Sequence, residues 1–128
     1  MTPSVLVFLV EDEELIRQLL EEALSEGGFA VTMASTGKEA MTLLDREGAE
    51  FGALITDVNL PGNVTGWDVA KRARELNDRL PVIYITGASA HDWASKGVPN
   101  SQLLTKPFAP AQVVTAVSQL INAAATSP

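Results

Sequence analysis

Short apolar runs of strand-forming residues alternate with amphipathic segments along almost the whole chain. The first run, residues 5–10, contains only Val, Leu and Phe, as expected for a strand buried on both faces. Further strands are predicted at residues 29–34, 51–56, 81–86 and 103–105, and helices at residues 15–24, 35–47, 69–76, 89–96 and 110–124. Such an alternation favours parallel strands joined by helical crossovers. We therefore predict one α/β domain, a doubly wound, five-stranded parallel sheet with five helices.

The size and composition of the chain fit a single globular domain. It has 128 residues, of which 46% are hydrophobic and 20% charged. We expect the domain to occupy residues 1–128, with its core at about 5–122 and a flexible tail at 123–128. There is no cysteine, which excludes disulfides and thiolate metal sites and suits a cytoplasmic protein. The apolar run 5–10 is too short to span a membrane, and no basic segment precedes it.

The charge of the chain argues against direct binding to nucleic acid. Sixteen acidic residues against nine basic ones give a net charge of −7, and no basic cluster is longer than Lys71-Arg72. A surface with this charge repels a phosphodiester backbone. Neither nucleic acid nor a membrane is therefore an expected direct partner.

Polar side chains follow the ends of four predicted strands. Glu11 and Asp12 come after the first, Asp57 after the third, Thr86 ends the fourth, and Lys106 follows the fifth. Ligands of doubly wound sheets bind beyond the carboxyl ends of the strands. We therefore expect three carboxylates, a hydroxyl and an ammonium group at one edge of the sheet.

This set of side chains suggests phosphoryl chemistry assisted by a metal ion. Three clustered acids must protonate, move apart or bind a cation, and ligands that are all oxygen favour Mg²⁺ (or Mn²⁺). A carboxylate can also attack a phosphoryl group. Asp57 is the expected nucleophile, Glu11 and Asp12 the metal ligands, Lys106 the partner of Asp57 or of the phosphoryl oxygens, and Thr86 a hydrogen-bond partner of the bound phosphoryl group.

Four short segments carry a resemblance to a known family. In order along the chain they are Leu9-Val10-Glu11-Asp12-Glu13, Ile55-Thr56-Asp57-Val58-Asn59-Leu60-Pro61-Gly62, Ile85-Thr86-Gly87 and Thr105-Lys106-Pro107-Phe108. Together they resemble the signatures of receiver domains of two-component response regulators, and the match extends over about residues 5–120. The resemblance implies the flavodoxin-like receiver fold.

The resemblance also implies a function and a ligand set. A histidine kinase or a histidine phosphotransfer protein would phosphorylate Asp57, with Mg²⁺ bound by Glu11, Asp12, Asp57 and the backbone carbonyl of Asn59. Phosphorylation would change the conformation and thereby the binding to an unknown downstream protein, and it could promote dimerisation. The chain would not be an enzyme beyond accepting phosphate on itself and hydrolysing it.

Further features of the site follow from the same resemblance. The peptide bond between Lys106 and Pro107 is a candidate for the cis form. Gly87 matches a position that stays small in the family, so that the phosphodonor can reach Asp57.

Three departures from the family pattern concern the surroundings of the site. The loop after Asp57 is one residue longer than usual before its glycine, so residues 63–65 could bulge over the site. The interval from Thr86 to Lys106 is about two residues shorter, which leaves a short fourth helix. Leu103 occupies the position where receivers carry a switching Tyr or Phe. Tyr84 and Trp93 are the aromatic residues that could replace that ring.

Other interpretations stay open at this stage. The main alternative function is a pseudo-receiver, which binds proteins without phosphorylation. Acids 11–14 could be ordinary residues of a helix N-terminus. His91 is expected on the surface, Trp67 in the core at the start of the third helix, and Trp93 over the edge of the core. Nothing that resembles an output domain follows Ile121, so a complete chain of this sequence would be a stand-alone receiver.

Overall fold

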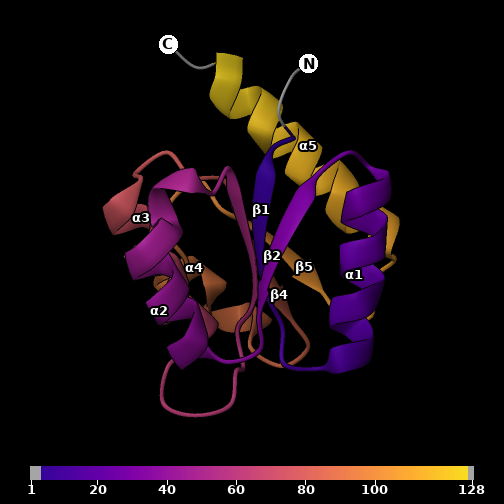
Figure 1. Cartoon of the computed structure of the whole chain (residues 1–128). Helices are drawn as coiled ribbons and strands as arrows, with labels where there is room; N and C mark the ends of the chain where they lie inside the picture. The colour runs from indigo at the N-terminus through magenta and orange to yellow at the C-terminus, as the bar shows by residue number, and fades with distance from the viewer. Residues whose placement is uncertain (1–3, 127–128) are drawn as a thin grey trace.

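The computed structural model describes residues 4–126, which form a five-stranded sheet between two layers of helices (Figure 1). All strand pairs are parallel, in the order β2-β1-β3-β4-β5. The strands are β1 (Leu6–Val10), β2 (Ala30–Ala34), β3 (Ala53–Asp57), β4 (Val82–Thr86) and β5 (Gln102–Thr105). The order of the strands reverses between β1 and β3, and the predicted doubly wound sheet is confirmed.

The helices divide between the two faces of the sheet. Figure 1 shows α1 (Glu14–Glu26) and α5 (Pro110–Thr126) on one side, and α2 (Gly37–Glu47), α3 (Gly66–Leu76) and the short α4 (Trp93–Lys96) on the other. Two 3₁₀ turns, η1 (Gly48–Glu50) and η2 (Ala90–Asp92), complete the described elements.

Two helices differ in detail from their expected bounds. The helix expected at residues 89–96 is a 3₁₀ turn followed by a single α-helical turn. Helix α5 runs on to Thr126, two residues past its expected end at residue 124. The flexibility of the tail stays a prediction, and residues 127–128 lie outside the described part of the chain.

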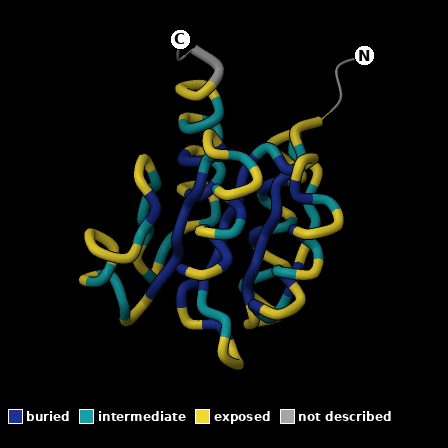
Figure 2. The backbone as a smooth tube through the Cα atoms, turned by 90° about the vertical axis from the view of Figure 1, so that its left-hand side faces the viewer, coloured by how far each residue is buried: buried dark blue, intermediate teal, exposed yellow. Residues whose placement is uncertain are grey.

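Each face of the sheet has its own hydrophobic core. Successive side chains of β1 enter opposite cores: Phe8 and Val10 pack toward α2 and α3, whereas Val7 and Leu9 pack toward α1 and α5. Strands β3 and β4 are buried along their whole length, and Figure 2 shows buried strands inside exposed helical turns. Burial on both faces explains why the strand sequences are almost continuously apolar.

The loop after β3 is held against the neighbouring helices. Thr65 and Asp68 form a capping box at the start of α3, in which the Thr65 amide donates to Asp68 Oδ2 at 3.0 Å. Val64 lies against Gly37 at the start of α2 and packs against the adjacent core. Val64 and Thr65 therefore do not bulge over the site as expected, because each has a partner on a helix.

Among residues 4–126, no helix is both long enough and apolar enough to cross a lipid bilayer.

Candidate functional site

The polar residues at the carboxyl ends of the strands converge as expected on one edge of the sheet. Glu11 follows β1, Asp57 is the last residue of β3, and Lys106 follows β5. Lys106 Nζ lies 2.9 Å from Asp57 Oδ2 and 3.6 Å from Glu11 Oε1. The β1/β3 boundary where they meet is the point at which the strand order reverses, the usual ligand position in such sheets.

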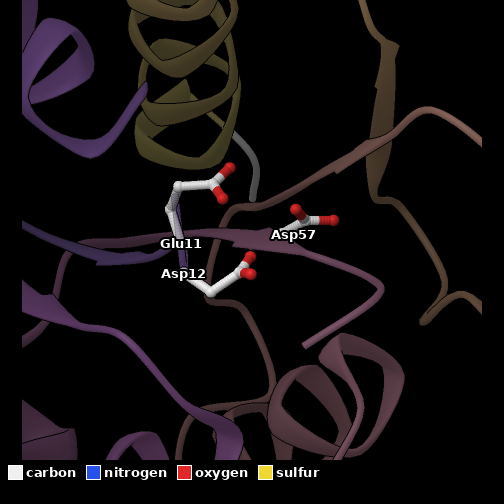
Figure 3. A group of neighbouring side chains, drawn as sticks. All are labelled: Glu11, Asp12 and Asp57. Atoms are coloured by element: carbon white, nitrogen blue, oxygen red, sulfur yellow. The ribbon is translucent and has the colours of Figure 1, made fainter. Parts of the chain in front are cut away.

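Three carboxyl groups face a common space at this edge. One carboxylate oxygen each from Glu11, Asp12 and Asp57 lie within 4.8 Å of one another, and Figure 3 shows Glu11 and Asp12 projecting from the end of β1 toward Asp57. Glu11 is fully buried, Asp57 is 4% exposed, and Asp12 faces solvent. The group can therefore be reached from outside through Asp12, while its other two members are shielded from water.

Glu11 has one carboxylate oxygen without a hydrogen-bond partner among the described residues. Its Oε2 accepts from the backbone amide of Glu13 at 3.0 Å, but its buried Oε1 accepts none. Burial, assisted by the negative charge of Asp57, raises the pKa of Glu11 to about 7, although the Glu13 amide and Lys106 oppose the rise. An unsatisfied buried oxygen next to two further carboxylates suits a hard divalent cation such as Mg²⁺.

Lys106 remains a cation in this setting. Burial works to lower its pKa, but the hydrogen bond from its ammonium group to Asp57 and the charges of Asp57 and Glu11 raise it above its ordinary value. Its charge offsets part of the repulsion between the two buried acids. The Lys106–Pro107 peptide bond is cis, as the resemblance implied.

The neighbouring loops supply further contacts to Asp57 and Thr86. The backbone amide of Asn59 donates to Asp57 Oδ1 at 3.2 Å. Thr86 is fully buried, and its hydroxyl oxygen accepts from the amide of Ser89 at 2.9 Å. The Ser89 hydroxyl in turn donates to the side-chain oxygen of Asn59 at 3.3 Å. Thr86 thus lies beside the site with its hydroxyl engaged by the following loop.

Sequence reasoning missed two residues that support the site. Ser89 was expected only as the start of a helix. Arg17 of α1 donates to the backbone carbonyl of Glu11 at 2.9 Å and so holds the acidic segment in place. Arg17 is the only basic residue in α1, which could have suggested its role, whereas Ser89 gave no signal.

The aromatic residues Tyr84 and Trp93 lie near β5, where Leu103 stands in place of the family's switching ring. Leu103 is half-buried against the core beneath α2 and α3. Tyr84 is fully buried, its ring is tilted by 56° against the Trp67 ring at a centroid distance of 4.7 Å, and its hydroxyl accepts a hydrogen bond from the Val98 amide at 3.0 Å. Trp93 is 36% exposed. The replacement of the switching ring by Tyr84 or Trp93 stays a prediction.

His91 is exposed and Trp67 is buried, as expected.

Two glycines flank the site with opposite packing constraints. Gly66 donates its amide to the Val58 carbonyl at 2.9 Å, and a Cβ at Gly66 would collide with the carbonyl oxygen of Asp57. A Cβ at Gly87 would meet only the Lys106 side chain, at 3.8 Å, which is an ordinary contact. Contacts within the chain therefore require glycine at position 66 but allow a larger residue at position 87.

We expect Gly66→Ala to lower the free energy of unfolding by about 1–3 kcal/mol, because the added methyl group must displace the backbone of Asp57 or the start of α3. Urea denaturation followed by circular dichroism measures the change. Gly87→Ala is the matched control and should stay within about 0.5 kcal/mol of the parent protein. Equal effects of the two substitutions would contradict this account of the packing.

The raised pKa of Glu11 predicts an unusual dependence of stability on pH. Glu11 binds a proton more tightly when folded (pKa about 7) than at its ordinary value of 4.5. Its contribution to stability is therefore complete below about pH 4.5 and is lost as the pH rises through about 7, by up to about 3 kcal/mol. Mg²⁺ should stabilise the protein more at pH 8 than at pH 6, because binding needs the ionised carboxylate.

Thermal and urea unfolding across this pH range, with and without Mg²⁺, measure both effects. Glu11→Gln, which keeps the shape but cannot ionise, is the control that removes this part of the pH dependence. If the parent protein and Glu11→Gln respond identically to pH and to Mg²⁺, the assignment of the titrating group to Glu11 is wrong.

Comparison with known proteins identifies the family. Residues 7–118 match the family model of the response regulator receiver domain. The response regulator receiver protein CpdR of Brucella abortus is 32% identical over 120 residues, which cover 92% of this chain and 98% of CpdR. The transcriptional regulatory protein CusR of Escherichia coli K12 is 30% identical over 118 residues, which cover 91% of this chain but 51% of CusR. The chain thus spans about half the length of CusR.

Solved structures agree with the sequence matches. The crystal structure of a response regulator receiver protein from Sinorhizobium medicae WSM419 superimposes with a TM-score of 0.90 at 42% identity, covering 94% of this chain and 97% of that one. The fold, the acidic edge of the sheet and the match over residues 7–118 lead to one conclusion. The chain belongs to the response regulator receiver domain family.

Proposed function

We propose that this chain accepts a phosphoryl group on Asp57 from the phosphohistidine of a histidine kinase or a histidine phosphotransfer protein. The observation that carries the proposal is the placement of Asp57, 4% exposed at the edge of the sheet with Lys106 at 2.9 Å and two further acids beside it. In the transfer, a carboxylate oxygen of Asp57 bonds to phosphorus, and the bond between phosphorus and the imidazole nitrogen breaks. The electron pair of that bond stays on the imidazole nitrogen. The donor leaves as neutral imidazole when its other ring nitrogen already carries a proton, and otherwise takes a proton from water, which becomes hydroxide.

The acidic residues of the site fit a divalent cation. Carboxylates of Glu11, Asp12 and Asp57, with the backbone carbonyl of Asn59, would hold Mg²⁺ (or Mn²⁺). The buried Oε1 of Glu11, which accepts no hydrogen bond from the described residues, supports this set. The ion supplies neutralisation of the charge on the phosphoryl oxygens.

The remaining site residues position the reacting groups. Lys106 orients Asp57 before transfer and pairs with the phosphoryl oxygens afterwards. The Thr86 hydroxyl is one strand away and donates to the phosphoryl group once it is present. Gly87 is exposed and leaves the approach to Asp57 open to the donor.

The proposed reaction is confined to the chain itself. The chain gains a phosphoryl group, loses it by hydrolysis, and changes its affinity for a downstream protein or for a second copy of itself. We expect the chain to act in the cytoplasm, a reducing compartment that suits a chain without cysteine. A phosphate-independent interaction module on the same fold is the competing function.

Incubation with acetyl phosphate and Mg²⁺ tests the proposal. Intact-mass spectrometry should show one phosphoryl adduct, peptide mapping should place it on Asp57, and excess EDTA should prevent it. Fluoroberyllate, which mimics the phosphoryl group, should bind in the presence of Mg²⁺. Failure to form the adduct together with failure to bind fluoroberyllate would favour the phosphate-independent module.

A further inference from the structure

Ser89 connects the two loops that border the phosphoacceptor. Its backbone amide donates to the Thr86 hydroxyl at 2.9 Å, and its own hydroxyl donates to the Asn59 side chain at 3.3 Å. Residues 59–65 lie between β3 and α3, whereas residues 87–89 lie between β4 and η2. We refer to this pair of hydrogen bonds as the Ser89 bridge.

The Ser89 bridge closes a ring of contacts around the phosphoacceptor. Asn59 is attached at two points, because its backbone amide donates to Asp57 Oδ1 at 3.2 Å while its side chain accepts from Ser89. On the opposite side the ring closes through the sheet, where the Val58 amide donates to the Ile85 carbonyl at 3.0 Å. A displacement of either Asp57 or Thr86 therefore acts on Ser89.

We propose that Ser89 is a positioning residue that fastens the loop after β3 to the loop after β4 in the unphosphorylated form and restrains the rearrangement that accompanies phosphorylation. This inference rests on the proposed function. The Ser89 amide donates to the Thr86 hydroxyl oxygen and so holds the Thr86 side chain toward the loop after β4. If the Thr86 side chain rotates to bring its hydroxyl to a phosphoryl group on Asp57, the oxygen moves away from the Ser89 amide and this hydrogen bond breaks. The Asn59 amide likewise loses Asp57 Oδ1 if that oxygen bonds to phosphorus.

The bridge also gives the chain a route from Asp57 to its surface that does not need an aromatic ring at Leu103. Ser89 directly precedes η2 and α4, and α4 begins with the partly exposed Trp93. When Ser89 loses its hydrogen bonds to Thr86 and Asn59, the residues that lead into η2 and α4 are no longer fastened to the two loops beside Asp57.

Measuring the affinity of the Mg²⁺-loaded protein for fluoroberyllate tests the bridge, because this ligand mimics the phosphoryl group without turnover. Ser89→Ala removes the hydroxyl that binds Asn59, and we expect it to raise the affinity roughly 2- to 10-fold, the range for one exposed neutral hydrogen bond. Asn59→Ala removes the acceptor of the same bond and should have a similar effect. The rate of adduct formation with acetyl phosphate should rise in parallel.

The double variant Ser89→Ala/Asn59→Ala distinguishes a shared bond from two separate effects. If the two residues act through one hydrogen bond, the double variant should bind fluoroberyllate no more tightly than the tighter single variant. Ser89→Thr keeps a hydroxyl and should restore the parent affinity. Ser95→Ala is the matched control, since Ser95 lies on α4 and its hydroxyl donates only to the Asp92 carbonyl.

Each outcome has a definite meaning. Unchanged affinity in both single variants, or additive effects in the double variant, would overturn the role of Ser89 while leaving phosphorylation of Asp57 intact. Absence of fluoroberyllate binding and of an adduct in the parent protein would overturn the proposed function and, with it, the bridge. If Ser89→Ala fails to fold, Asn59→Ala and Ser89→Thr still report on the same bond.

Discussion

Asp57→Asn should abolish the phosphoryl adduct completely. The amide has nearly the same shape as the carboxylate and can still accept the hydrogen bond from the Asn59 amide, so the fold should persist. It lacks the anionic oxygen that attacks phosphorus, and no other described acid is both shielded and bonded to Lys106 at 2.9 Å. Intact-mass spectrometry after incubation with acetyl phosphate and Mg²⁺ measures the loss.

Asp45→Asn provides the matched control for this experiment. Asp45 is an exposed acid that pairs with Arg72 at 2.9 Å between α2 and α3, away from the site. Its replacement should leave the amount of adduct unchanged. An adduct that persists in Asp57→Asn would show that phosphate goes to a different residue and would sink the assignment of the nucleophile.

Lys106→Met should reduce the rate of adduct formation by about 10- to 100-fold, which corresponds to the loss of one charge-assisted hydrogen bond. Methionine keeps much of the aliphatic stem but offers no ammonium group to Asp57 or to the phosphoryl oxygens. The loss of the Lys106 charge also removes an interaction that lowers the pKa of Glu11. Glu11 should therefore ionise at higher pH, and the pH at which Mg²⁺ binds should rise with it. The rate with acetyl phosphate at saturating Mg²⁺ is the measurement.

Lys96→Met separates this effect from a general change of charge. Lys96 is an exposed lysine at the end of α4 whose nearest acid, Asp92, is 3.8 Å away. Surface pairs of this kind contribute little, so the rate should stay close to that of the parent protein. A similar fall in the Lys96 and Lys106 variants would mean that overall charge, and not the contact with Asp57, controls the reaction.

The sheet and the principal site residues could be predicted from the sequence because simple physical rules govern them. Strands buried on both faces must be apolar throughout, which marks β1, β3 and β4. Parallel strands bring their carboxyl ends to one edge, which groups Glu11, Asp57 and Lys106 without knowledge of any distance. The pattern alone therefore defined the fold class and the acidic site.

Features that depend on packing could not be predicted. Glu11 and Asp12 are adjacent acids, yet only Glu11 is buried, because the end of β1 directs neighbouring side chains to different environments. The fourth helix shrinks to one turn, since isolated short helices are marginal and Trp93 is its only large apolar residue. Helix α5 continues past the apolar stripe that ends at Ile121, because the alanines that follow favour helix.

The site is assembled from segments that are distant along the chain. Lys106 and Asp57 are separated by 49 positions, and Glu11 comes from a third strand, so no fragment that lacks β1, β3 or β5 contains all three groups. Labelling by acetyl phosphate should consequently be much faster in molecules whose edge strand β5 has docked and brought Lys106 to Asp57. The chemical reaction can thus serve as a probe of native assembly, for instance to count correctly folded molecules during refolding or in a library of variants.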